Sequence, residues 1–361
     1  MIEHRFGEVA ALSLGVEEEM MILDGASLDQ VGAVDVLLRE SAGSELPGSL
    51  KTELFASVVE LNTGICRDVT EAADALGSLR GAAADAARRN GLAIAGAGTH
   101  PFARPEQQPV VDEERYTSFV GYAGISARRQ GVQGLHVHLA MPAAEPCWSV
   151  LEGILPWLPL VLALSANSPY LAGIATGLAS NRAPVLAELP RAGAPPELGS
   201  YAGWEAWVER LVDLGVTADY TRIWWDVRPH PRFGTLEVRM PDQPTELRMS
   251  VTLVALLQAL AATLLDAPDG QRCDRGHYAQ NRWAAARFGP GAELIHPDAS
   301  RTARVPELWA ELLALVEPAA VELGTLPLLE DLDAGTCEAE LQLEAGDPHA
   351  AAAALVERTL R

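Results

Sequence analysis

Lysine is almost absent from this sequence, and cysteine is rare. Lys51 is the only lysine among 361 residues, and no GxxxxGK[ST] motif surrounds it, which excludes a P-loop nucleotidase. None of the four cysteines belongs to a CxxC pair, so the chain carries no signature of a zinc ribbon or a thioredoxin-like redox site. Few, widely spaced cysteines favour a reducing compartment, and we expect a cytoplasmic protein.

Positive charge is scarce as well. The chain has 27 lysine and arginine residues against 49 acidic residues, which gives a net charge of −22. Such a charge repels nucleic-acid phosphates and anionic lipid surfaces. Neither a nucleic acid nor a membrane is therefore expected as a partner.

A long apolar run is also lacking. Glu3 and Glu8 stand where a signal peptide would have basic residues followed by an apolar segment, so no signal peptide is expected. The longest apolar stretch, residues 153–166, contains Pro156 and Pro159 and is shorter than the roughly 20 residues that a membrane span requires. We interpret it as a buried core helix.

The sequence does have ample apolar material, 48% of its residues, for a large core. No repeat or shift in composition divides the chain, so one catalytic domain over residues 1–361 is expected. Alternation of apolar and polar residues predicts strands over residues 12–24, 58–63, 92–98, 134–141, 222–228 and 235–240. The last two strands are joined by a short connection, which favours an antiparallel hairpin and an antiparallel or mixed sheet.

Helical periodicity separates these strands. The clearest helix begins at Asp68, has Glu71 three residues later in a capping-box arrangement, and ends before Gly91. Further helices are expected from Pro244 onward and over residues 204–214, 307–323 and 348–360. The Pro- and Gly-rich segments 183–199 and 267–276 are predicted to be loops over the sheet.

Acidic residues interrupt the otherwise apolar strand over residues 14–23. Alternation places Glu17 and Glu19 on one face and Glu18 on the other. Two carboxylates about 7 Å apart on one sheet face repel each other, and a cation neutralises such a pair. Because hard divalent ions such as Mg²⁺ take oxygen ligands, the pair is a candidate metal clamp, with a solvated strand face as the alternative.

Three more strands collect polar side chains on one face. These sets are Glu60 with Asn62, His136 with His138, and Thr235 with Glu237 and Arg239. A lone histidine is often structural, but an HxH pair in an apolar strand favours contact with a metal or a phosphate. A surface ion pair between Glu237 and Arg239 is the plainer explanation of the last set. If one sheet gathers all four faces, its surface can hold metal ions with phosphates between them.

Further arginines fit that surface. Arg182 follows a loop of small residues that would let a ligand approach the backbone, and Arg228 and Arg232 flank the proline-stiffened turn of the hairpin. The planar guanidinium group suits bidentate phosphate or carboxylate recognition. We expect Arg228, Arg232 and His136 to contact the cofactor, although surface solvation is the alternative for each arginine and is strongest for Arg232.

Six segments form a recognisable series along most of the chain. They are GVEEEMMILD (15–24), VVELNTGIC (58–66), AGTHPF (97–102), GLHVHLAMP (134–142), LALSANSPYLAGIATGLASNRA (162–183) and WWDVRPHPRFGTLEVRMPDQPT (224–245). In this order the series resembles the type 2 glutamate–cysteine ligases, also described as carboxylate–amine ligases. The chain departs from that family near its end, where an acidic CEAELQLEAGD stands in place of a more basic, glutamine-containing helix.

The resemblance implies a glutamine-synthetase-like α+β fold, with a curved, mainly antiparallel sheet packed on helices. It also implies an ATP- and Mg²⁺-dependent ligase for small-molecule substrates, the γ-carboxylate of glutamate with cysteine or another amine. In that reaction the carboxylate attacks the γ-phosphate of ATP, and the amine then displaces phosphate from the acyl phosphate. Carried over by motif, the metal ligands or their near neighbours are Glu17, Glu19, Glu60, His138 and Glu237. Arg239 and Arg182 correspond to phosphate or acyl-phosphate contacts and are the expected catalytic residues.

A zinc-dependent hydrolase of the amidohydrolase type is the main rival, because HxH on a strand also begins many such metal sites. That site requires further histidines and usually a lysine on later strands. Lys51 lies upstream, and His230, His277 and His296 fall in segments expected to be loops or irregular. A non-catalytic nucleotide-binding module is a third reading, and the cost of gathering so many like charges argues against it. An exposed sheet edge would allow a homodimer.

Overall fold

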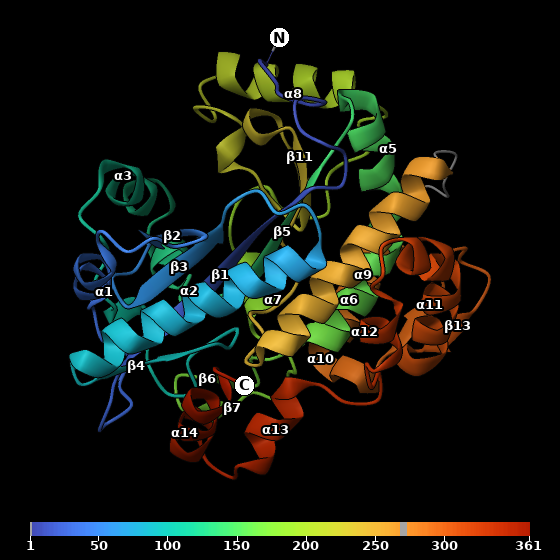
Figure 1. The fold of residues 1–361 in the computed structure, drawn as a ribbon. Coiled ribbons are helices and arrows are strands. Elements are labelled where there is room, and N and C mark those ends of the chain that lie inside the picture. Colours follow the sequence, from blue (N-terminus) through green and yellow to red (C-terminus); the bar gives the residue numbers. More distant parts are fainter. Residues whose placement is uncertain (1, 268–272) are drawn as a thin grey trace.

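The computed structural model describes residues 2–267 and 273–361. Its centre is a seven-stranded sheet in the order β10-β11-β5-β1-β3-β2, with β4 also paired to β1 (Figure 1). The strands are β1 Leu14–Asp24, β2 Gly48–Thr52, β3 Val58–Thr63, β4 Leu92–Ala95, β5 Leu135–Ala140, β10 Val227–His230 and β11 Thr235–Val238. Every pairing in this sheet is antiparallel, which confirms the expectation from the short hairpin.

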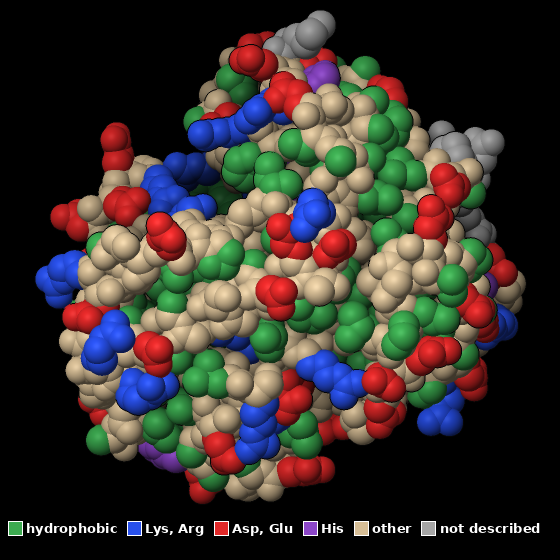
Figure 2. Space-filling model, in the orientation of Figure 1, with side chains coloured by type: hydrophobic (Ala, Val, Ile, Leu, Met, Phe, Trp, Pro, Cys, Tyr) green, Lys and Arg blue, Asp and Glu red, His purple; other side chains and the backbone are tan. Residues whose placement is uncertain are grey.

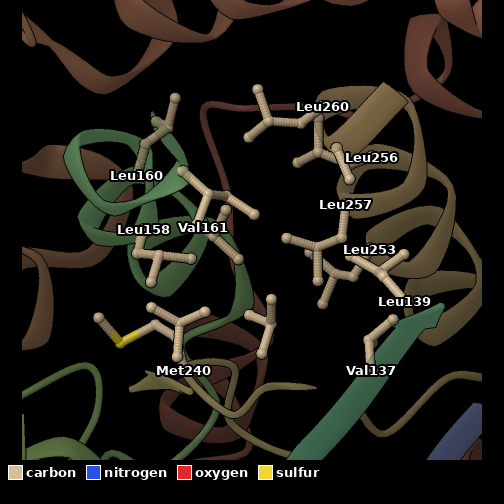
Figure 3. Packing of buried hydrophobic residues seen from close by; sticks show 14 of the residues in the cluster. Val137, Leu139, Leu158, Leu160, Val161, Met240, Leu253, Leu256, Leu257 and Leu260 are labelled. Atoms are coloured by element: carbon tan, nitrogen blue, oxygen red, sulfur yellow. The ribbon is translucent and has the colours of Figure 1, made fainter. Parts of the chain in front are cut away.

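The helices pack on the apolar face of the sheet. Long helices α2 (Val69–Arg89) and α9 (Leu247–Asp266) run along this face, and α5 (Ala144–Ile154) and α6 (Leu158–Ser165) pack beside α9 (Figure 1). Val137 and Leu139 of β5 point toward leucines of α9, with α6 on the far side of the same core (Figure 3). The period-2 pattern of the strands therefore separates an apolar face under helices from a polar face that is left for ligands.

The helix that was clearest in the sequence is confirmed. Helix α2 starts after Asp68, whose carboxylate accepts a hydrogen bond from the Glu71 backbone N–H at 2.9 Å. The Glu71 carboxylate completes the turn by accepting from the backbone of Arg67 rather than from that of Asp68. Satisfying these otherwise free N–H groups fixes where the helix begins.

The remaining elements surround this core. The other helices are α1 Val34–Ser41, α3 Glu114–Ala123, α4 Ile125–Arg128, α7 Arg182–Leu186, α8 Tyr201–Asp213, α10 Arg275–Phe288, α11 Val305–Glu322, α12 Leu326–Glu330, α13 Glu338–Glu344 and α14 Pro348–Arg358. Short 3₁₀ helices are η1 Pro105–Gln107, η2 Leu155–Trp157, η3 Tyr220–Arg222, η4 Pro231–Phe233 and η5 Gly289–Gly291. Two-residue and three-residue strands form the pairs β6 Tyr170–Leu171 with β7 Ile174–Ala175, β8 Ala192–Gly193 with β9 Trp224–Trp225, and β12 Glu293–Ile295 with β13 Thr302–Arg304.

Several sequence expectations about local structure are wrong. The strand predicted over residues 222–228 is divided at Asp226: Trp224 and Trp225 pair with β8, and β10 begins only at Val227. The Asp226 carboxylate accepts hydrogen bonds from Tyr278 and Arg282, which turns this residue away from a continuous strand. The segment predicted as a loop over residues 183–199 contains most of α7 and all of β8. In the second predicted loop, over residues 267–276, the last two residues already belong to α10, and residues 268–272 lie outside the described residues.

Within residues 2–267 and 273–361, two helical segments are long and apolar enough to cross a membrane, Ala144–Ser165 and Leu247–Asp266. Both are mostly buried inside the protein, where they form the core against the sheet. The first includes the stretch that the sequence predicts as a buried core helix, and its burial confirms that interpretation. It is broken into α5, η2 and α6 around Pro156 and Pro159, because proline cannot donate the helical hydrogen bond.

The acidic C-terminal segment folds back toward the end of the β10–β11 hairpin. The carboxylate of Glu338, at the start of α13, accepts hydrogen bonds from the backbone N–H groups of Thr245 and Glu246 at 2.8 and 3.0 Å. The side-chain amide of Gln342 donates to Asn167 Oδ1 at 2.7 Å. This segment thus braces the chain that leads from β11 into α9. The expectation of one domain over residues 1–361 stays a prediction.

Candidate active site

Four neighbouring strands bring their polar faces together on the side of the sheet away from α2 and α9. The paired positions are Glu17 with His136 and with Asn62, Glu19 with Glu60, and His138 with Glu237. The intervening residues, such as Val137 and Leu236, are fully buried in the core. The expectation that one sheet collects these side chains is confirmed.

The first group of potential metal ligands is Glu17, His138 and Glu237. One ligand atom from each residue lies within 4.8 Å of the others. His138 Nδ1 is hydrogen-bonded to Thr235 Oγ1 at 2.9 Å, and its Nε2 lies 3.5 Å from Glu17 Oε1. A hydroxyl on the far nitrogen orients the ring and leaves Nε2 facing the carboxylates, as a metal ligand requires.

The second group is Glu19, Glu53 and Glu60, whose carboxylate oxygens also lie within 4.8 Å of one another. Sequence analysis named Glu19 and Glu60 but missed Glu53, which directly follows strand β2. The signal was weak, because Glu53 follows a short strand with little apolar character. Three carboxylates at this separation match the oxygen-rich environment that hard divalent cations prefer.

The protonation properties of the second group differ sharply from those of isolated carboxyls. Burial, followed by the charge of Glu53, raises the pKa of Glu19 to about 8. Burial together with the charges of Glu17, Glu53 and Glu19 raises the pKa of Glu60 well above its ordinary value. Like charges brought together in a desolvated site favour the protonated form. A bound divalent cation would reverse this preference.

Glu237 is compensated by arginines on its own hairpin. Arg228 forms two hydrogen bonds with its carboxylate, at 2.6 and 3.2 Å, and Arg239 Nη1 donates to the same carboxylate. Burial alone would raise the pKa of Glu237, but the charges of Arg228 and Arg239 bring it well below its ordinary value. Glu237 is therefore an ionised carboxylate whether or not a metal is bound.

The pKa values of His136 and His138 are also shifted in opposite directions. Burial, assisted by the charge of Arg239, lowers the pKa of His136 to about 4 although Glu17 lies 3.2 Å from its Nδ1. Burial opposes protonation of His138 as well, but its hydrogen bond to Glu17 and that carboxylate's charge raise its pKa overall. Burial would raise the pKa of Glu17, and the hydrogen bonds to both histidines lower it well below its ordinary value.

Two pockets open on the polar face, one on each side of the Glu17–Glu19 segment. The larger, about 280 Å³, contains Glu17, His138, Asn62 and apolar side chains, with Arg5 and Lys51 among its lining residues. Figure 2 shows a recess bordered by Lys and Arg side chains on the face where the chain near α8 meets β2 and β3. The smaller pocket, about 90 Å³, contains Glu19, Glu53, His136, Arg182 and Arg239 among its lining residues.

The expected arginines occupy three different environments. Arg182 lines the smaller pocket; it is buried and donates from Nη1 and Nη2 to the backbone oxygens of Met240 and Arg239 at 3.1 and 2.9 Å. Arg228 is held by Glu237 and by the carbonyl of Ile223. Arg232 is exposed on η4, so among the described residues the structure brings Arg182, Arg228 and Arg239 to the polar face but not Arg232.

Glu18 has a separate role on the opposite face of β1. Its carboxylate accepts hydrogen bonds from Arg80 Nε and Nη2 at 2.7 and 2.6 Å, and both side chains are completely or almost completely buried. Gln243 donates to the same carboxylate, while its own amide oxygen accepts from the Glu19 backbone N–H. A network behind the sheet thus holds the strand that carries Glu17 and Glu19.

Of the three histidines that the sequence assigned to loops or irregular segments, two lie elsewhere. His230 is buried in strand β10, with its ring 5.5 Å from that of His138, and His277 lies in α10. Burial lowers the pKa of His230 to about 4. The paired strands β10 and β11 bring His230 beside the site, a tertiary effect that its Pro-rich flanks concealed.

Carboxylate and histidine clusters between two pockets on an antiparallel sheet form a candidate metal-binding site. A model of glutamate–cysteine ligase family 2 matches residues 13–356, so the chain belongs to this family. As a member it is a ligase, which sets the hydrolase reading aside.

Individual relatives agree with this placement. Two proteins of Rubrobacter xylanophilus carry the provisional names glutamate–cysteine ligase 2-1 and 2-3. The first is 37% identical over 99% of this chain and 97% of its own length, and the second is 38% identical over 94% and 90%. A glutamate–cysteine ligase of Francisella tularensis, solved in complex with AMP, is 15% identical and has a TM-score of 0.66, with 97% of this chain and 89% of that chain covered. The glutamine-synthetase-like α+β fold expected from the sequence is confirmed.

Proposed function

We propose that this protein is an ATP- and Mg²⁺-dependent carboxylate–amine ligase that forms an amide through an acyl phosphate. The acid is the γ-carboxylate of glutamate, and the amine is cysteine or another small amine. The observation that carries the proposal is the pair of carboxylate clusters on one sheet face with a pocket on either side. Such an arrangement allows two reactants to meet at a row of cation-binding groups.

The larger pocket suits the nucleotide. It offers the apolar side chains of Val9, Ile65 and Phe233 to a base, and Arg5 and Lys51 to phosphates. Lys51 is the only lysine in the chain, and it faces the polar side of β2 opposite Glu60. A nucleotide in this pocket would place its terminal phosphate beside Glu17 and His138.

The smaller pocket suits the acid. Arg239 and Arg182 line it, and Arg182 keeps one buried guanidinium nitrogen, Nε, without a hydrogen-bond partner among the described residues. Planar guanidinium groups recognise a carboxylate or the phosphoryl group that it acquires. The catalytic role of both arginines is part of the proposal.

Mg²⁺ fits the donor set. Glu19, Glu53 and Glu60 would hold one ion, because buried carboxylates with raised pKa values gain from a neutralising cation. Glu17, His138 and Glu237 would hold another with ligand atoms that lie within 4.8 Å of one another. Bound Mg²⁺ would offset the charge of the phosphates as it shifts during transfer. Glu237 also binds the guanidinium group of Arg239, and so would keep this arginine near a bound ion.

The reaction balances without a covalent enzyme intermediate. A carboxylate oxygen of the acid bonds to the γ-phosphorus of ATP, the bond from that phosphorus to the β-γ bridging oxygen breaks, and ADP leaves. The amine nitrogen then bonds to the acyl carbon, and phosphate leaves with the oxygen that came from the acid and takes up the proton released by the amine. The protein supplies position and charge complementarity.

The test is a matrix of acids and amines incubated with ATP and Mg²⁺, with products identified by mass. We expect an amide, ADP and inorganic phosphate, with no turnover when the divalent cation is chelated. An acid labelled with ¹⁸O in its carboxylate is expected to deliver one label to the phosphate. Formation of AMP and pyrophosphate, or label-free phosphate, would overturn the acyl-phosphate route.

The cellular setting is proposed with the function. All four cysteines are free and buried, which fits the reducing cytoplasm where ATP is abundant. Strands β2 and β10 are the edges of the central sheet, so a homodimer through an edge stays a prediction. Size-exclusion chromatography with light scattering measures the oligomeric state directly.

A further inference from the structure

The smaller pocket contains buried hydrogen-bond acceptors that lack donors. Gln130 and Gln133 both line it and are 8% and 1% exposed. In each side chain the amide oxygen Oε1 has no hydrogen-bond partner among the described residues. A buried acceptor without a donor is unfavourable, so a ligand that supplies N–H groups here would gain binding energy.

Both residues make hydrogen bonds to the surrounding chain. The Gln130 side-chain nitrogen donates to the backbone oxygens of Ser126 and Val185, both at 3.0 Å, which leaves its oxygen as the free end. The Gln133 backbone is held on both sides: its N–H donates to Gly98 and its carbonyl accepts from Gln243. The Gln130 side chain and the Gln133 backbone are thus held in place before any ligand arrives.

The rest of the lining is complementary to an amino acid. Arg182 and Arg239 offer positive charge to a carboxylate, and Trp224, Leu186 and Leu189 supply an apolar wall. The glutamine amides are neutral acceptors, which suits an ammonium group because they do not compete with the carboxylates for a metal ion. A simple dicarboxylic acid would leave both amide oxygens unsatisfied.

We propose that the smaller pocket recognises the acid substrate as an α-amino acid, with the Gln130 and Gln133 amide oxygens accepting hydrogen bonds from its ammonium group. The proposal rests on the proposed function, in which the carboxylate to be activated lies beside Glu19 and Arg239. Gln130 and Gln133 are then specificity-determining residues. A site built to bind an N–H group rejects an otherwise equal ligand that lacks it.

The probes are L-glutamate and glutarate, which is glutamate without its amino group. Calorimetric titration into the protein with Mg²⁺ and without nucleotide is expected to give glutamate at least about 10-fold tighter binding than glutarate. Gln133→Leu removes one acceptor and is expected to reduce that preference by about 10-fold. Gln108→Leu is the matched control, because Gln108 is also buried with an unpartnered amide oxygen and is not among the lining residues. It is expected to leave the preference unchanged.

Steady-state kinetics distinguishes the role of the two glutamines from the proposed ligase activity. Gln133→Leu is expected to raise KM for glutamate about 10-fold and to leave KM for ATP and for the amine within about twofold. Thermal unfolding checks that the variant folds, and Gln130→Leu is read in the same titration if it does not. Equal binding of glutamate and glutarate to the unaltered protein, or binding of neither, would overturn the inference, as would a shift in KM for the amine alone. Absence of ATP turnover with every acid would instead refute the proposed function, and the titration would still decide the role of the glutamines.

Discussion

Glu237 and Glu60 have the same side chain on the same sheet face, yet their surroundings give them opposite charge preferences. Glu237 lies between Arg228 and Arg239, which keep its pKa far below that of a free carboxyl after burial has been overcome. Glu60 faces three other carboxylates, and burial with their charges raises its pKa. One glutamate is therefore part of a charge-balanced hairpin, and the other needs a cation to be ionised.

This contrast predicts opposite effects of two isosteric substitutions on the metal-free protein. Glu60→Gln removes a repelled carboxyl and is expected to raise the free energy of unfolding by about 1 kcal/mol. Glu237→Gln leaves two buried arginines without their partner and is expected to lower it by about 3–5 kcal/mol. Denaturant unfolding without metal measures the free energy of unfolding of both variants. Equal changes in the two variants would show that Glu60 and Glu237 do not have opposite charge preferences.

Arg239 tests the proposed chemistry at the level of one functional group. Arg239→Lys keeps the positive charge but loses the planar fork, so kcat is expected to fall about 100-fold with a smaller change in KM. Arg232→Lys, on the exposed turn η4, is the matched control and is expected to retain turnover. Steady-state kinetics at saturating Mg²⁺ compares them, and near-normal turnover of Arg239→Lys would remove Arg239 from the mechanism.

Strand β1 serves both faces of the sheet. Glu17 and Glu19 point to the pockets, whereas Glu18 is buried against Arg80 of α2 on the other side. Arg80 also donates to the backbone oxygens of Thr245 and Thr359. One buried ion pair therefore ties β1, α2, the start of α9 and the C-terminal turn together, and it fixes the strand that presents the candidate metal ligands.

Removing one partner of the Glu18–Arg80 ion pair is expected to lower the free energy of unfolding more than removing both partners. Arg80→Met leaves the Glu18 carboxylate buried without its main partner and is expected to reduce the free energy of unfolding by about 3–5 kcal/mol. The double change Glu18→Met with Arg80→Met removes both charges and is expected to be less destabilising than Arg80→Met alone. Urea unfolding of the two variants provides the comparison, and a double variant that loses the sum of two large single effects would contradict the argument.

At the scale of the whole molecule, the cluster of buried carboxyls that suits a cation also lowers the stability of the metal-free protein. The folded protein concentrates Glu19, Glu53 and Glu60 in one cluster, in a chain whose net charge is −22. A carboxyl with a raised folded-state pKa keeps a proton that the unfolded chain has released. Raising the pH through that interval therefore removes stability.

The metal-free protein is accordingly expected to lose stability between pH 6.5 and 8. With a folded-state pKa of about 8, Glu19 alone accounts for a loss of about 2 kcal/mol over this window. The pKa values of His136 and His230 are lowered to about 4. These two histidines affect stability mainly below pH 6.5, where their contribution increases as the pH rises. Saturating Mg²⁺ is expected to flatten the decline, because it binds the ionised carboxylates. Unfolding curves at several pH values test this, and stability that rises across the window would contradict it.

The sequence determined the features that depend on local periodicity. Alternation placed Glu17 and Glu19, His136 and His138, and the polar side of β11 on defined strand faces, because successive residues of a strand point to opposite sides. The cap at Asp68 fixed the start of α2 in the same local way. These expectations rest on neighbours along the chain, and they hold in the folded protein.

Only the tertiary structure decided which faces meet and what each charge contacts. Glu53 joins the acidic cluster because β2 pairs with β3, and Glu18 finds Arg80 because α2 packs across the sheet. Arg228 turns to Glu237 while Arg232 is left in solvent, although both flank one short turn. Partners and pKa values depend on distances between segments far apart in the sequence, and those distances are set by strand register and helix packing rather than by local pattern.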